Sequence, residues 1–94
     1  MQFNNDKKFK INSNIISSSI SNEIILLNIE SGKYIEISGS GKDIWHLLAE
    51  SESIEYDQII TNIISNHNGA EKALVKDIDD FLIHAVKLGL IYEK

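Results

Sequence analysis

The chain has 94 residues, a net charge of −5 and 43% hydrophobic residues, which is enough for one domain with a single modest core. It contains no Cys, which excludes disulfides, thiolate metal sites and a Cys nucleophile. Its nine basic residues are all Lys, and because Arg is the usual residue for phosphate clamps and guanine contacts, the composition disfavours a nucleic-acid partner.

The N-terminal part of the chain is polar, and we expect residues 1–8 to be frayed at the start of a single domain spanning 1–94. No signal peptide and no run of the about 18 apolar residues that span a membrane is present, so we expect a cytoplasmic protein with no membrane partner. Residues 9–11 alternate and predict a short strand. Residues 12–22 are rich in Ser and Asn and predict an irregular connection, with a candidate strand at 15–17.

A β-hairpin is predicted next. Residues 23–29 are a nearly continuous apolar run of strand length, which indicates a strand that is central or covered on both faces. A turn containing Gly32 follows. In residues 33–37, Tyr34 and Glu36 alternate with Ile35 and Ile37, as in a second strand.

Three helices are expected after the hairpin. The first begins near Ser38 or Ser40 and ends near residues 49–51, and the second begins at Ser53 or Tyr56. The third covers about residues 71–88 and ends at Gly89. Its apolar stripe, which we expect to face the core, consists of Leu74, Ile78, Phe81, Ala85 and Leu88. Together the elements predict an α+β domain of winged-helix type, a three-stranded antiparallel sheet followed by three helices.

Catalytic and metal-binding patterns are missing from the sequence. No G-x-S-x-G motif is present, and His46, His67 and His84 fall on different helices or helix ends, so we interpret them as surface histidines. Residues 39–42 read Gly-Ser-Gly-Lys, but a phosphate-binding loop needs Ser or Thr where Asp43 stands. We therefore expect a non-enzymatic protein without a cofactor or metal.

The third helix carries an acidic run formed by Asp77, Asp79 and Asp80. These positions spread around much of the helix circumference. The run fits a solvated helix face or a docking patch for a Lys-bearing partner, and less well a pair of catalytic carboxylates.

The stretch from residue 23 to residue 48 resembles the PqqD family, and the resemblance extends over about residues 9–91. Its hairpin pattern is matched by Asn28, Ser31, Gly32 and Tyr34. Its helix pattern, I-W-x-L-L after a Gly, is matched by Gly41, Ile44, Trp45, Leu47 and Leu48. Its C-terminal pattern is matched by Asp77-Ile78, Phe81-Leu82 and residues 88–91.

This resemblance implies a recognition element for ribosomally made, modified peptides, closest to the stand-alone leader-binding proteins of lasso-peptide biosynthesis. Such domains bind the precursor's leader as an added antiparallel strand, here on residues 33–37 and against the third helix. They present the precursor to a separate enzyme, which would be a cysteine protease that removes the leader or another modifying enzyme. The alternatives are a PqqD-type peptide chaperone for a radical enzyme and, less favoured because of the acidic third helix, a winged-helix nucleic-acid binder.

Strand addition takes affinity from main-chain hydrogen bonds and specificity from side-chain pockets. On this basis the residues expected to bind the peptide are Lys33, Tyr34, Ile35, Glu36 and Ile37 on the strand and Val75, Ile78, Asp79 and Leu82 on the third helix. An Asp in place of Ile35 or Leu82 is expected to weaken peptide binding.

Overall fold

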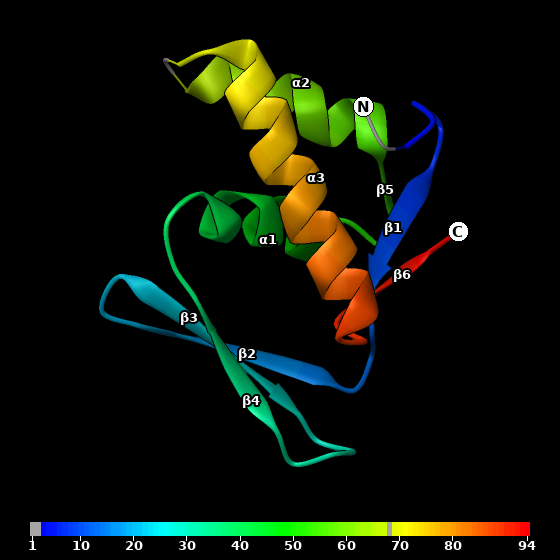
Figure 1. Ribbon diagram of the computed structural model, residues 1–94. Coiled ribbons are helices and arrows are strands. Elements are labelled where there is room, and N and C mark those ends of the chain that lie inside the picture. The colour runs from blue at the N-terminus through cyan, green and yellow to red at the C-terminus, as the bar shows by residue number, and fades with distance from the viewer. Residues whose placement is uncertain (1–2, 68) are drawn as a thin grey trace.

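The structure is a computed structural model that describes residues 3–67 and 69–94 (Figure 1). The strands are β1 (Lys8–Ile11), β2 (Ile15–Ile20), β3 (Glu23–Asn28), β4 (Tyr34–Ile37), β5 (Ile54–Glu55) and β6 (Ile91–Glu93). The helices are α1 (Ser40–Glu50), α2 (Tyr56–Asn66) and α3 (Glu71–Lys87). The α+β class, the central hairpin and the three helices are confirmed.

The strands form two antiparallel three-stranded sheets, with the orders β2-β3-β4 and β5-β1-β6. The segment expected to be irregular supplies β2, which pairs with β3 along its whole length. The strand near residues 9–11 instead joins the C-terminal strand β6, in a register that sets Ile11 opposite Ile91. Pairing between the two ends of the chain has no local sequence signal, and this is why the second sheet was missed.

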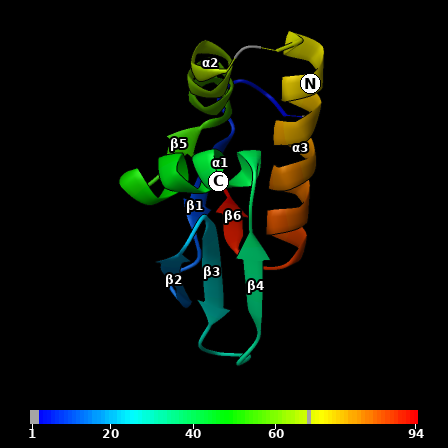
Figure 2. The ribbon, with the colours of Figure 1, turned by 90° about the vertical axis from the view of Figure 1, so that its left-hand side faces the viewer.

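The core lies between the three helices and one face of the β2-β3-β4 sheet (Figures 1 and 2), and the second sheet adds Phe9, Ile54 and Ile91 to it. Ile24, Leu26 and Ile37 enter it from the sheet and are each less than 10% exposed. The helices contribute Ile44, Trp45, Leu48, Ile59, Ile60, Ile63, Ile78, Leu82 and Ala85. The N-terminal segment is also anchored, because the ring of Phe3 lies 5.1 Å from that of Phe9. Its residues 3–7 therefore pack on the domain, and residues 1–2 of the expected frayed segment lie outside the described residues.

The core-facing side of α3 differs from the expected stripe. Ile78, Leu82 and Ala85 are buried, whereas Leu88 is 50% exposed and Phe81 is half-buried. The apolar surface of α3 is therefore wider than the core needs, and part of it faces away from the core. No helix within the described residues is long and apolar enough to cross a membrane.

The end of α3 is fixed by a Gly and a buried Asn. Gly89 has φ 75°, and the N–H groups of Gly89 and Leu90 donate to the carbonyls of Val86 and Ala85, as in a Schellman motif. The amide of Asn12 donates to the Gly89 carbonyl at 2.9 Å, and the Asn12 N–H donates to the Leu90 carbonyl. These bonds hold Leu90 next to β4.

We expect Asn12→Ala to lower the free energy of unfolding by about 1–3 kcal/mol, because the partly buried Gly89 carbonyl and the Asn14 N–H lose their side-chain partner. Urea unfolding of the two proteins measures this difference. Asn14→Ala is the control, since its side-chain bond to Glu30 is exposed, and it should change stability by less than about 0.5 kcal/mol. Equal losses in both variants would contradict the role of Asn12.

Candidate functional site

β4 has a free edge. It pairs with β3 on one side, and within the described residues no strand pairs with its other side. Figure 2 shows the C-terminal end of β4 beside the last turns of α3, so this end of the free edge lies next to the helix. An unpaired edge offers N–H and C=O groups to an incoming strand.

The hydrogen-bond alternation shows which backbone groups point to this edge. The Asn28 N–H donates to the Lys33 carbonyl at 2.9 Å, next to the pairing of Leu27 with Tyr34. Since hydrogen-bonded and non-hydrogen-bonded pairs alternate in an antiparallel ladder, Ile35 bonds to β3. The N–H and C=O groups of Tyr34 and Glu36 then face the free edge.

Two adjoining cavities lie along β4 and α3, and we call them together the β4–α3 groove. The first has a volume of about 340 Å³ and is lined by Ile35, Glu36, Ile37, Ser38, Ser40, Gly41, Phe81, His84, Ala85, Leu88 and Leu90. The second has a volume of about 600 Å³ and is lined by Leu26, Asn28, residues 31–35, Lys87, Leu88 and Leu90. Ile35, Leu88 and Leu90 belong to both, so the two cavities form one continuous groove.

One end of the groove is closed by a tight contact. A Cβ on Gly41 would lie 3.0 Å from side-chain carbons of both Ile37 and Phe81. Gly41 is therefore the residue that lets α1 approach this point while Ile37 and Phe81 line the groove. The match of Gly41 to the family pattern thus has a steric reason.

One end of the groove carries a positive charge. Lys33 and Lys87 line the larger cavity, whereas Glu36 borders the smaller one with its backbone and points its side chain to the other face of the sheet. The floor of the groove is apolar, formed by Ile35, Leu88 and other aliphatic side chains. A groove with an apolar floor, a free strand edge and a charged end can bind an extended peptide chain.

The structure brings the expected strand residues to the groove and places the expected helix residues outside it. Ile35 and Ile37 line it with their side chains, Lys33 lines its larger cavity, and Tyr34 and Glu36 border it. Ile78 and Leu82 are instead 1% and 0% exposed in the core. Val75 is half-buried against the core, in the N-terminal half of α3.

The groove wall on the α3 side is formed by Phe81, His84 and Ala85 of the helix and by Leu88, which directly follows it. Phe81, Ala85 and Leu88 belong to the apolar stripe that the sequence predicts, but from the sequence this stripe is expected to face the core. Periodicity identifies an apolar helix face without showing what covers it, so a peptide groove and a core look alike in the sequence. The Asp substitution proposed for Leu82 would therefore test folding, because this side chain is fully buried.

Asp79 lies buried in the core and not in the groove. It is 6% exposed and accepts a hydrogen bond from the Tyr56 hydroxyl, which comes from the first residue of α2. Burial, the hydrogen bond and the negative charge of Asp79 raise the pKa of Tyr56 well above its ordinary value. Of the acidic run, Asp77 and Asp80 are exposed, and Asp80 pairs with Lys76.

We expect Tyr56→Phe to lower the free energy of unfolding by about 1–3 kcal/mol at neutral pH, since a buried carboxylate loses a donor. A raised tyrosine pKa stabilises the fold below the ordinary value of 10.0, and this stabilisation is lost as the pH rises above it. The stability gap between wild type and variant should therefore narrow above about pH 10. Thermal unfolding between pH 8 and pH 11 tests this, and a constant gap would contradict it.

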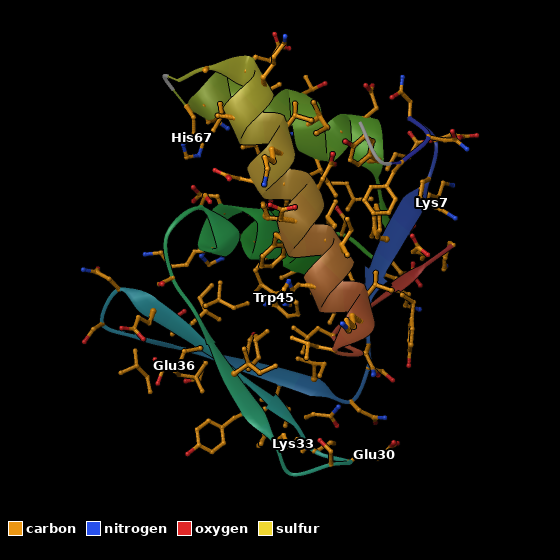
Figure 3. All side chains as sticks on the ribbon, viewed as in Figure 1. Lys7, Glu30, Lys33, Glu36, Trp45 and His67 are labelled. Carbon is orange, nitrogen blue, oxygen red and sulfur yellow. The ribbon has the colours of Figure 1, made fainter. Side chains whose placement is uncertain are left out.

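The three histidines, which are interpreted from the sequence as surface residues, all line cavities, and one of them contacts an acidic side chain. His67 Nε2 lies 3.0 Å from Asp43 Oδ2, and both line a cavity of about 310 Å³ with His46. His84 borders the groove. Figure 3 shows His67 at the end of α2, far from the groove along β4.

Comparisons with known proteins identify the family of this chain. The family model for coenzyme PQQ synthesis protein D (PqqD) matches residues 23–91, most of the chain, and the chain therefore belongs to the PqqD family. The solved structure of TbiB1 in complex with the TbiA(beta) leader peptide is similar, with a TM-score of 0.77 and 27% sequence identity. The similarity covers 87% of this chain and 93% of that one. No match was found among the curated proteins.

Proposed function

We propose that this protein recognises the leader of a ribosomally made precursor peptide and binds it as an additional antiparallel strand on β4, in the β4–α3 groove. The observation that carries this function is the free edge of β4 facing an apolar groove wall on α3. The similarity to TbiB1, which was solved with a leader peptide, supports it.

The binding residues that we propose are residues 33–37 on the strand side and Phe81, His84, Ala85, Leu88 and Leu90 on the other side. Tyr34 and Glu36 supply main-chain hydrogen bonds, and Ile35, Ile37 and Leu88 supply apolar contacts. The two lysines at the larger cavity favour a leader with an acidic residue near Lys33 and Lys87.

We further propose that the protein serves lasso-peptide biosynthesis and delivers the leader to a separate cysteine peptidase. The chain itself contributes binding energy and position and no catalytic step. A second candidate, favoured by the description of the family model, is a peptide chaperone that presents a precursor to a radical enzyme of cofactor synthesis. Both use the same groove, and the identity of the peptide that binds distinguishes them.

The test is a titration with labelled peptides from short open reading frames beside the gene, with leader and core segments made separately. The leader should bind saturably, and the core segment and a scrambled leader should not. Amide hydrogen exchange should show new protection at Tyr34 and Glu36 and little change at Ile35, which already bonds to β3. Equal binding of leader and scrambled leader would refute the proposal.

A further inference from the structure

The β2-β3-β4 sheet has a second face that the described chain leaves uncovered. We call it the outer sheet face, and it consists of Ile16, Ser18, Ile20, Glu23, Ile25, Leu27, Tyr34 and Glu36. The apolar run of β3 predicted cover on both faces or a central position. β3 is central, but helices pack on its inner face alone within the described residues (Figure 2).

The side chains of this face are aligned in rows. Ile16 lies opposite Leu27, and Leu27 lies opposite Tyr34, so one apolar row crosses all three strands. In the next row Ile25 stands between Ser18 and Glu36. Directly paired residues in an antiparallel sheet point to the same side, and therefore these side chains form one continuous surface.

The exposure of these residues is unusual for a solvated sheet face. Ile16, Ile20 and Tyr34 are 53%, 59% and 70% exposed, and Leu27 is 36% exposed. A sheet with one face in water normally carries polar residues there. A contiguous apolar surface of this kind marks a contact site.

The charge on this face has one sign. Glu23 and Glu36 both lie on it. The pKa of Glu36 is raised mainly by a hydrogen bond between the two side chains and, to a smaller extent, by repulsion between their charges. Neither carboxylate takes part in an ion pair within the described residues. In Figure 3 the Glu36 side chain lies on the side of the sheet away from α3.

This charge pattern distinguishes between possible occupants. A second copy of the chain would bring the same carboxylates to the interface, and the eight residues that define this face include no Lys to balance them. An anionic membrane would be repelled for the same reason. A protein surface that is apolar and carries an Arg or Lys would cover the apolar row and neutralise the acidic pair.

We propose that the outer sheet face docks the leader peptidase through an apolar patch that contains a basic side chain. This inference rests on the proposed function. The leader would bind at the groove, the peptidase would bind on the outer face, and the β2-β3-β4 sheet would bring the two close together. The face has fewer residues than the about 20–30 per partner of a standard interface, so the contact is transient.

The experiment measures binding of the purified peptidase encoded beside the gene to the full chain. Ile16→Lys and Leu27→Lys should each weaken it about tenfold or more, because they remove apolar contact and repel the partner's cation. Glu23→Lys should slow association and remove part of its salt dependence. Ile83→Lys is the control, since Ile83 is 43% exposed on α3, and it should bind the peptidase as wild type does.

Leader affinity is measured in parallel, and it should be unchanged in all four variants because none of these residues lines the groove. No leader binding by the wild-type chain would refute the proposed function. Intact leader binding with no peptidase binding, or with equal peptidase binding by all variants, would refute the docking surface alone. If the wild-type chain self-associates, or binds anionic vesicles, and Leu27→Lys abolishes this, then a second copy or a membrane covers the outer sheet face and the docking proposal is wrong.

Discussion

Leu88→Asp will weaken leader binding by about 2 kcal/mol, or roughly 30-fold in Kd. Leu88 lines both cavities of the β4–α3 groove, and a bound leader would cover the part of its side chain that now faces water. An Asp there removes this apolar contact and places a carboxylate in a groove that the leader closes. Isothermal titration with the labelled leader measures the effect.

The variant is informative because the fold does not depend on Leu88. Its side chain is 50% exposed, so the free energy of unfolding should fall by less than about 1 kcal/mol. Ile83→Asp is the matched control, since it replaces an aliphatic side chain of α3 that is 43% exposed and lies outside the groove. If both variants bind the leader equally well, Leu88 does not contact it.

Glu36→Pro will weaken leader binding about tenfold or more while the domain stays folded. The N–H of Glu36 faces the free edge of β4, and Pro removes this donor and places its ring in the path of the incoming strand. Proline is tolerated on edge strands where the lost N–H does not belong to the ladder. Leader titration measures the loss, and circular dichroism checks the fold.

The matched control is Glu36→Gln, which keeps the backbone donor and changes the side chain alone. It should bind the leader as wild type does, because this side chain lies on the outer sheet face. Equal losses in the Pro and Gln variants would show that the side chain, rather than the strand edge, contacts the leader.

The Leu88 and Glu36 tests address the two walls of the groove separately. One wall supplies apolar contact from α3, and the other supplies main-chain hydrogen bonds from β4. If only Leu88→Asp weakens binding, the leader lies in the groove without joining the sheet. If only Glu36→Pro does so, the leader joins the sheet without reaching α3.

Local patterns in the sequence were sufficient for the hairpin, the helices and the strand that forms one side of the β4–α3 groove. The alternation of Tyr34 and Glu36 with Ile35 and Ile37 defines a strand with two different faces, and Gly32 and Gly89 have the positive φ that a turn and a helix end require. These features depend on residues close together in the chain. The ordered motifs from residue 23 to residue 48 also indicated the family, which the family match confirms.

The residues on the helix side of the groove were decided by tertiary packing. Leu82 lies on α3 and Leu88 directly follows it, yet Leu82 is fully buried and Leu88 is 50% exposed in the groove. Which of them faces the core depends on how α3 is rotated against α1 and the sheet, and the Asn12 bonds to residues 89 and 90 hold its C-terminal end. These contacts join residues more than 70 positions apart, so no local pattern reports them.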